Sequence, residues 1–126
     1  MAVLDGGDLK VTTDIQPVFL YPDQAVPLSL LVAEATTNAM KYIGDQASET
    51  AVIDVRLTQD DRACLLVISN SVGQAEEKES TGLGSQLMNA FAMQVGGQIE
   101  AEQTEGRYTL TLQFNALEFQ PESRDF

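Results

Sequence analysis

The sequence predicts a two-layer α/β (α+β) sandwich, in which a mixed β-sheet carries helices on one face. Two segments have the apolar spacing of helices, and the other apolar segments either alternate or are continuously apolar over a short run, as strands are. Their order is strand, helix, hairpin, loop, helix, hairpin. The 126 residues, 44% of them hydrophobic, suffice for one compact core. We expect a single domain over 1–126, with its core at about 9–114 and a loose acidic tail at 115–126.

The first half of the chain contains a strand, a long helix and a hairpin. Residues 9–15 are β-prone, and a helix follows over roughly 24–43, with Asp23 as its N-cap and Gly44 as its C-cap. Segments 51–58 and 63–69 form a hairpin around a turn at Asp60–Asp61. The run 63–69 is continuously apolar, which predicts a central strand buried on both faces. Alternation in segment 51–58 places three residues on one face: Ile53, Val55 and Leu57.

The second half repeats this pattern around a polar loop. Residues 70–82 are small and polar, and a helix follows over 83–95 until Gly96–Gly97 ends it. Strands near 98–103 and 107–114 form a second hairpin around Glu105–Gly106. The expected inner stripe of the helix is Leu87, Ala90, Phe91, Gln94 and Val95.

Composition excludes several classes of function. The net charge is -12, from 19 acidic and 7 basic side chains, which argues against nucleic acid as a partner. The chain has no histidine, so it supports neither a serine-histidine triad nor a His-ligated zinc site. Its single cysteine, Cys64, lies in an apolar run and is expected to be a buried structural thiol. No apolar run is long enough to span a bilayer, so we expect a cytoplasmic domain without membrane contact.

Three polar residues interrupt the apolar first helix at a helical spacing. Glu34, Asn38 and Lys41 stand four and then three residues apart, which stacks them on one flank. An acceptor, an amide and a cation in line suit a general base, a metal ligand and a phosphate contact. A solvent-facing stripe with an ordinary Glu/Lys pairing tendency explains the same spacing.

A glycine pair stands where the polar loop enters the second helix. Gly82, Leu83 and Gly84 lie at the positive end of the helix dipole, where exposed backbone N–H groups favour phosphate. Loops entering helices often contain glycine, so this pattern alone is weak.

Together the two patterns resemble a known family. Residues 30–42 are similar to the N-box of histidine kinases. Their sequence is Leu-Leu-Val-Ala-Glu-Ala-Thr-Thr-Asn-Ala-Met-Lys-Tyr. Residues 81–91 resemble the G2 box of the same kinases. Their sequence is Thr-Gly-Leu-Gly-Ser-Gln-Leu-Met-Asn-Ala-Phe. Over roughly 20–114 the chain therefore resembles the Bergerat-fold (GHKL) ATPases. The sequences of the two motifs are similar to those of the HWE and HisKA_2 sensor kinases.

The resemblance implies roles for particular residues. Glu34 would polarise the phosphoacceptor, Asn38 would ligate Mg²⁺, Lys41 would contact phosphate, and Tyr42 would line the adenine. Segment 70–81 would be a short ATP lid. The residues that would bind the nucleotide are Asn38, Lys41, Tyr42, Asn70, Gly73, Gly82, Leu83 and Gly84.

The chain departs from the family in two motifs. The G1 aspartate, which accepts a hydrogen bond from the adenine amine, is replaced by Ser69 or Asn70, depending on a one-residue shift; Asn70 is the preferred alignment. Gly106–Arg107 stands where Gly-Thr is common. The phosphoacceptor helices and the usual first helix of the domain are absent. Residue 1 is thus either a boundary within a longer kinase or the start of a small stand-alone protein.

The resemblance implies the ATP-binding catalytic domain of a two-component sensor histidine kinase. Such a domain binds Mg-ATP and transfers the γ-phosphate to a histidine on a separate helical domain, which a response regulator then reads. Alone it would be inactive, because the chain has no histidine. Two alternatives remain: a degenerate relative that docks a response regulator or kinase, and an anti-sigma-factor type of serine kinase.

Overall fold

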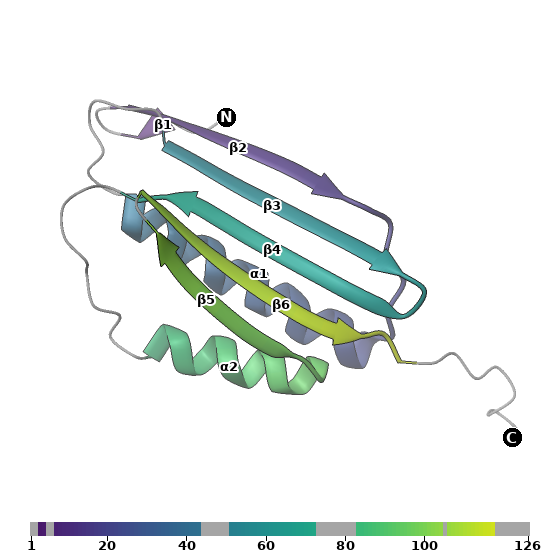
Figure 1. The fold of residues 1–126 in the computed structure, drawn as a ribbon. Coiled ribbons are helices and arrows are strands. Elements are labelled where there is room, and N and C mark those ends of the chain that lie inside the picture. Colours follow the sequence, from purple (N-terminus) through teal and green to yellow (C-terminus); the bar gives the residue numbers. More distant parts are fainter. Residues whose placement is uncertain (1–2, 5–6, 44–50, 73–82, 105, 118–126) are drawn as a thin grey trace, which may run out of the picture.

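The computed structural model describes residues 3–4, 7–43, 51–72, 83–104 and 106–117. In these ranges six strands form one sheet in the order β1-β2-β3-β4-β6-β5. Strands β2 and β3 are parallel, and the other neighbours are antiparallel, so the sheet is mixed (Figure 1). The elements are β1 (Val3–Leu4), β2 (Gly7–Ile15), α1 (Pro22–Ile43), β3 (Ala51–Asp60), β4 (Ala63–Ser71), α2 (Leu83–Val95), β5 (Gln98–Thr104) and β6 (Arg107–Asn115).

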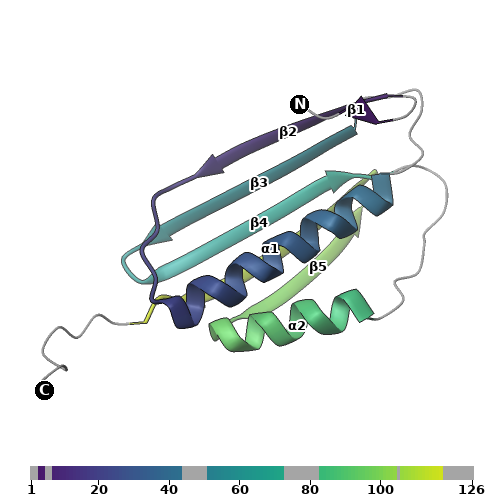
Figure 2. The same cartoon turned by 180° about the vertical axis from the view of Figure 1, so that it is seen from behind.

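Both helices lie on the same face of the sheet, as Figure 2 shows. Apolar residues on alternate positions of β4 and β6 pack against α1 and α2, and this two-layer arrangement confirms the predicted sandwich. The core cluster comprises Leu28, Leu31, Ala35, Cys64, Leu66, Ile68, Met88, Ala92, Val95, Leu110, Leu112, Phe114 and Ala116. None of the helices in the described part of the chain is long and apolar enough to cross a membrane.

The strands begin and end slightly differently from the prediction. Strand β2 begins at Gly7 rather than at residue 9, and the short β1 was not predicted. The two residues between β3 and β4 are Asp61 and Arg62, and Asp61 has a positive φ of 61°, so the turn lies one residue later than expected. Residues 70 and 71, assigned to the loop from the sequence, end β4.

The prediction that segment 63–69 is buried on both faces is wrong. Cys64, Leu66 and Ile68 face the helices and are buried, whereas Leu65 is 37% exposed on the opposite face. Among the described elements, helices cover only one face of β4 (Figure 2). We call the other side of the sheet the open face.

The helix termini also correct the sequence analysis. Helix α1 begins at Pro22, and the Tyr21 carbonyl accepts the N–H groups of residues 24 and 25, so Asp23 lies in the first turn instead of capping it. Helix α2 ends at Val95 as predicted, and Gly96 adopts a φ of 87°, which glycine reaches without strain. The position of Gly44 lies outside the described residues.

Helix α2 presents a different inner stripe from the predicted one. Met88, Ala92 and Val95 are buried and Phe91 is partly buried, whereas Leu87 is 38% exposed. Ala90 and Gln94, also expected inside, are exposed as well. The helical period was correct, but its phase was wrong by roughly one residue.

A buried glutamine ties the two helices to β6. Gln24 is 2% exposed, and its Nε2 donates to the carbonyl oxygens of Val95 at 2.8 Å and Asn115 at 3.0 Å. Its Oε1 accepts the backbone N–H of Leu117 at 2.9 Å. One side chain therefore fixes the start of α1 against the end of α2 and the chain after β6.

Candidate functional site

One end of the molecule collects the elements that carry the polar motifs. Figure 1 shows the end of α1, the arrowhead of β4 and the beginnings of β6 and α2 at this end. A small cavity lies among them. Its lining residues are Ala35, Asn38, Ile68, Asn70, Met88, Tyr108 and Leu110.

Asn38 comes to this cavity because of its place on α1. It lies three residues after Ala35, which is 6% exposed and belongs to the core, so both side chains are on the inner side of the helix. Asn38 itself is half-buried and lines the cavity. Glu34 is half-buried and Lys41 is exposed on the same helix, but neither lines the cavity. The predicted polar flank is therefore divided between the cavity and the surface.

The structure separates the two alternatives for the G1 position. Asn70 pairs with Ile53 and Tyr108 in the sheet, faces the helices and is 1% exposed. Ser69 points to the open face, where its hydroxyl accepts a hydrogen bond from Nη2 of Arg107 at 3.2 Å. Adjacent residues of a strand face opposite sides, so only Asn70 lines the cavity.

The Asn70 amide has a defined orientation. Its Nδ2 donates to the Ser71 carbonyl oxygen at 2.9 Å. Only the NH₂ group of an amide can face a carbonyl oxygen at this distance, so Oδ1 is the acceptor on its other branch. An acceptor there matches the exocyclic amine of adenine rather than the carbonyl oxygen of guanine.

The cavity is much smaller than a nucleotide base. Its volume is ≈ 10 Å³, about the space of one water molecule. Sites for small ligands usually have about 300–1,000 Å³. The chemistry of the lining fits an adenine, but the present side-chain arrangement leaves no room for one.

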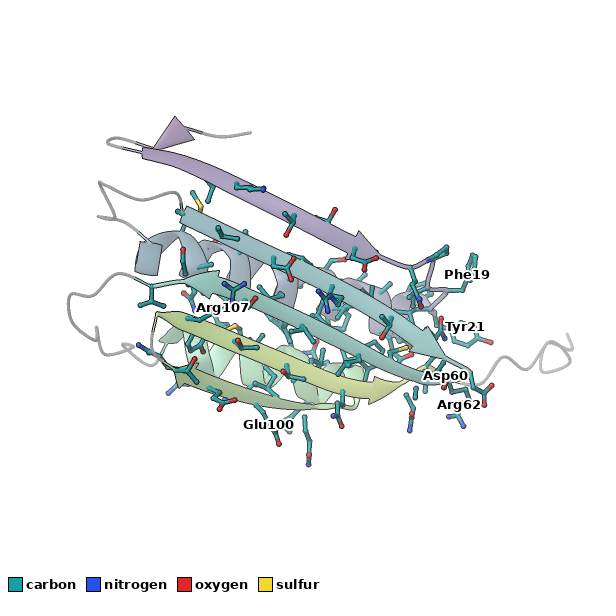
Figure 3. All side chains as sticks on the ribbon, turned by 45° about the horizontal axis from the view of Figure 1, so that its top comes forward. Phe19, Tyr21, Asp60, Arg62, Glu100 and Arg107 are labelled. Atoms are coloured by element: carbon teal, nitrogen blue, oxygen red, sulfur yellow. The ribbon has the colours of Figure 1, made fainter. Side chains whose placement is uncertain are left out.

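A larger hollow lies at the opposite end of the sheet. Its volume is ≈ 630 Å³, and its lining includes Asp60, Leu65, Gly97, Gln98 and Gln113. Figure 3 places Asp60 and Arg107 at opposite ends of the sheet, so this hollow is far from the Asn70 cavity. The predicted nucleotide-binding residues whose side chains the structure describes are Asn38, Lys41 and Asn70, and none of these three lines the hollow.

Cys64 lies at the inner edge of this hollow. It is 3% exposed, which confirms the predicted buried thiol. Burial raises the pKa of the thiol by desolvating its anion, and a hydrogen bond from the Ala116 backbone offsets this in part. The sulfur is therefore a poor nucleophile, and it packs as an apolar group.

Acidic residues do not form a metal cage in the part of the chain that the structure describes. No group of three or more Asp, Glu, Cys or His side chains there is close enough together to hold a metal ion.

A family model matches residues 23–118 of the chain, with the description "Histidine kinase-, DNA gyrase B-, and HSP90-like ATPase". Because this covers most of the sequence, the chain belongs to that ATPase family. No curated protein sequence matches the chain.

Solved structures of histidine kinases share its fold. The blue-light activated histidine kinase EL346 of Erythrobacter litoralis superposes with a TM-score of 0.76 at 16% identity, covering 87% of this chain and 36% of that one. The histidine kinase AdeS of Acinetobacter baumannii gives 0.69 at 18% identity, covering 90% and 57%. The catalytic domain of the histidine kinase ThkA gives 0.65 at 17%, covering 88% and 79%. The chain thus has the fold of a histidine-kinase catalytic domain and spans about a third of the length of EL346.

The structure brings some of the predicted site residues together and leaves others undescribed. Asn38 and Asn70, from different elements, meet in one cavity. Leu83 and Gly84 begin α2 at the same end of the molecule, but their side-chain surroundings are not described. The side chain of Tyr42, and Gly73 and Gly82 altogether, lie outside the described residues.

Sequence reasoning missed Tyr108 and Met88 as lining residues. Tyr108 had no local signal in the sequence, because its place opposite Asn70 comes from the pairing of β6 with β4. Met88 required the correct phase of α2.

Proposed function

We propose that this chain is the ATP-binding catalytic domain of a sensor histidine kinase, and that Mg-ATP binds between α1 and the start of α2. The observation that supports this most strongly is that Asn38 and Asn70 line the same cavity. The two residues come from separate motifs, one on α1 and the other on β4. Membership of the ATPase family supports the same ligand.

Each of these residues would contact a different part of Mg-ATP. Asn70 would accept a hydrogen bond from the adenine amine through Oδ1, since Nδ2 is engaged by Ser71. Asn38 would place its amide oxygen on Mg²⁺, which neutralises phosphate charge when bound. Lys41, exposed near the end of α1, would reach the phosphates as a mobile cation.

The start of α2 would complete the phosphate site. Backbone N–H groups in the first turn of a helix attract anions, and Gly82, Leu83 and Gly84 stand at that point of the sequence. This matters in a chain with a net charge of -12, which repels a polyphosphate unless local donors shield it. Gly73 and Tyr42 remain proposed ligand contacts on the resemblance alone.

The phosphoacceptor has to be supplied by another domain, because the chain has no histidine. The γ-phosphoryl group would pass from ATP to an imidazole nitrogen of that domain and leave ADP. Glu34, half-buried on the flank of α1, would polarise the acceptor imidazole. A response regulator in the cytoplasm would then receive the phosphoryl group.

A second function has two observations in its favour. The ≈ 10 Å³ cavity and the uncharged Asn70 suit a degenerate relative that keeps the fold and docks a partner protein without nucleotide. Loss of the carboxylate weakens the hydrogen bond to adenine, because charged acceptors bind about twice as strongly as neutral ones.

Calorimetric titration of the purified chain with a non-hydrolysable ATP analogue distinguishes the two functions. We expect saturable binding that strengthens when Mg²⁺ is added. Asn38→Ala should reduce the Mg²⁺-dependent increase in affinity for the analogue by at least about tenfold, which corresponds to about 1.4 kcal/mol of binding free energy. Thr37→Ala is the matched control, because Thr37 is exposed on the same helix and bonds only back to the Ala33 carbonyl among the described contacts.

The result decides between the proposals. If the wild-type chain binds no analogue at millimolar concentration, and a normal thermal transition shows that it is folded, the result would support the docking module. Equal Mg²⁺ dependence in the Asn38→Ala and Thr37→Ala variants would place the metal elsewhere.

A further inference from the structure

Strand β2 lies near the edge of the sheet, and most of its outer side is unpaired among the described residues. The short β1 pairs only with Gly7 and Asp8, so no described strand bonds to the outer side of residues 9–15. Figure 2 shows that neither described helix extends beyond β2 on this side. A row of exposed backbone N–H and C=O groups of this kind is a template for pairing with another chain.

The same stretch of β2 exposes apolar side chains. Val11 is 50% exposed and Ile15 is 56% exposed. They pair with Ile53 and Leu57 of β3, so both lie on the face of the sheet that carries the helices. A strand added outside β2 would cover part of these β-branched residues, which suit a half-buried sheet surface.

The sequence of β2 is complementary to itself when the strand is reversed. Residues 9–15 read Leu-Lys-Val-Thr-Thr-Asp-Ile. In an antiparallel pair of two copies centred on Thr12, the opposed residues are Leu9 with Ile15, Lys10 with Asp14, Val11 with Thr13, and Thr12 with itself. Opposite charges and matching β-branched or apolar residues are the cross-strand pairs that stabilise a sheet. A shift of two residues in either direction removes the Lys10–Asp14 pair, and a shift of one exchanges the two faces of the partner strand.

This register also fits the extent of the unpaired edge. The strand of the second copy would end at its Ile15, opposite Leu9, one residue before the segment that β1 already pairs. The two-fold axis would pass through Thr12. Its hydroxyl donates a hydrogen bond to Oδ1 of Asp54, which directs the side chain towards β3 and away from its symmetry copy.

The opposite edge of the sheet disfavours self-pairing. Strand β5 is the edge strand there, and both Glu100 and Glu102 on it are exposed. An antiparallel pair of two β5 strands centred on residue 100, 101 or 102 sets two glutamates directly against each other, which is destabilising. Pairing through β2 therefore closes on itself as a two-fold dimer instead of extending into a filament of sheets.

We propose that two copies of this chain associate through β2, as an antiparallel pair centred on Thr12, and form one continuous sheet. The Lys10–Asp14 pair occurs twice in this interface because of the two-fold symmetry. An interface limited to one strand edge is small, so the dimer is a weak one, with a Kd of roughly 1 μM to 1 mM. Neither Lys10 nor Asp14 lines the small cavity or the large hollow, so the association is independent of the proposed nucleotide site.

Sedimentation equilibrium of the purified chain tests the association. The net charge of -12 on each copy opposes it at long range, so the measurement uses 0.15 M salt, where the screening length is about 8 Å. We expect a monomer–dimer equilibrium in the wild type. A wild-type chain that stays monomeric up to about 1 mM would overturn the proposal, whatever its affinity for ATP.

Reversing either charge tests the register. Lys10→Asp and Asp14→Lys each set like charges opposite one another at two places, so each variant alone should dimerise at least about tenfold more weakly than wild type. An equal mixture of the two should recover wild-type association, because each variant supplies the charge that the other lacks. Recovery also shows that both variants are folded. A mixture as weakly associated as the separate variants would overturn the proposal.

Glu100→Lys is the matched control, since it changes the net charge as Asp14→Lys does but lies on β5. Its Kd for dimerisation should stay within about threefold of the wild-type value, because it is outside the proposed interface. If Glu100→Lys alters the association while both β2 variants behave as wild type, the interface lies at β5 and the proposal is wrong.

A cysteine at the two-fold axis supplies a test that does not depend on charge. Directly opposed residues of an antiparallel pair have Cα atoms about 4.5–5.5 Å apart, which a disulfide can span. Thr12→Cys should therefore form a covalent dimer under mild oxidation, whereas the wild type should not, because its Cys64 is buried. Glu102→Cys on β5 should remain monomeric under the same conditions. Equal cross-linking of the Thr12→Cys and Glu102→Cys variants would overturn the proposed register.

Discussion

Replacing Gln24 by alanine gives the sharpest test of how the two layers are held together. The substitution removes three hydrogen bonds from a side chain that is 2% exposed. Each such bond contributes about 1 kcal/mol, and a buried group left without its partner costs about 1–3 kcal/mol. Because the carbonyls of Val95 and Asn115 and the N–H of Leu117 all lose a partner, we expect about 4 kcal/mol of destabilisation. Domains of this size have only about 5–15 kcal/mol in total.

Urea unfolding followed by circular dichroism measures this loss. Gln16→Ala is the matched control, because Gln16 is an exposed glutamine whose Oε1 accepts a single bond, from the Gln59 N–H at 3.0 Å. The control should change stability by less than about 1 kcal/mol. A Gln24→Ala variant as stable as the control would refute the view that this side chain joins α1, α2 and β6. Gln24 lies at the opposite end of α1 from Asn38, so ATP affinity at low temperature should not change.

Three further changes follow from the packing. Gly97→Ala should destabilise the fold by at least about 2 kcal/mol in urea titrations, because a Cβ there would overlap the Gln113 carbonyl oxygen; wild-type stability would refute the close approach. Cys64 should react with a thiol reagent far more slowly in the native than in the unfolded chain. Since the folded thiol has the raised pKa, its contribution to stability is present below about pH 8.5 and is lost as the pH rises further; a Cys64→Ala variant with the same alkaline profile would contradict this. Asn70→Asp puts a carboxylate oxygen against the Ser71 carbonyl, so the melting temperature should fall more at pH 8 than at pH 5; an equal fall would show that the carboxylate turns elsewhere.

The sequence predicts the strands best where one face is buried. Alternation correctly assigned Ile53, Val55 and Leu57 to the inner face, because a period of two leaves no other consistent choice. The same rule failed for Leu65: a continuous apolar run looks alike whether one or two layers cover the strand. For α2 the apolar residues surround much of the helix, so its phase depended on the partner surface.

The site was partly accessible from the sequence. The sequence singled out Asn38 by its spacing on α1, and this residue does line the small cavity, whereas Glu34 and Lys41 of the same flank do not. Ser69 and Asn70 could not be separated, because a one-residue shift exchanges the two faces of a strand and both residues are polar. Tyr108 was missed because its place beside Asn70 depends on the pairing of β4 with β6, which no local pattern reveals.

The most direct test is to locate the nucleotide by NMR, using the side-chain amide signals of asparagine and glutamine during an ATP titration with Mg²⁺. The chain offers reporters at both ends of the sheet: Asn38 and Asn70 in the small cavity, and Gln98 and Gln113 in the large hollow. We expect saturable shifts of the two asparagines, with the two glutamines unchanged. Shifts confined to the glutamines would contradict the account, because ATP would then bind in the hollow at the far end of the sheet.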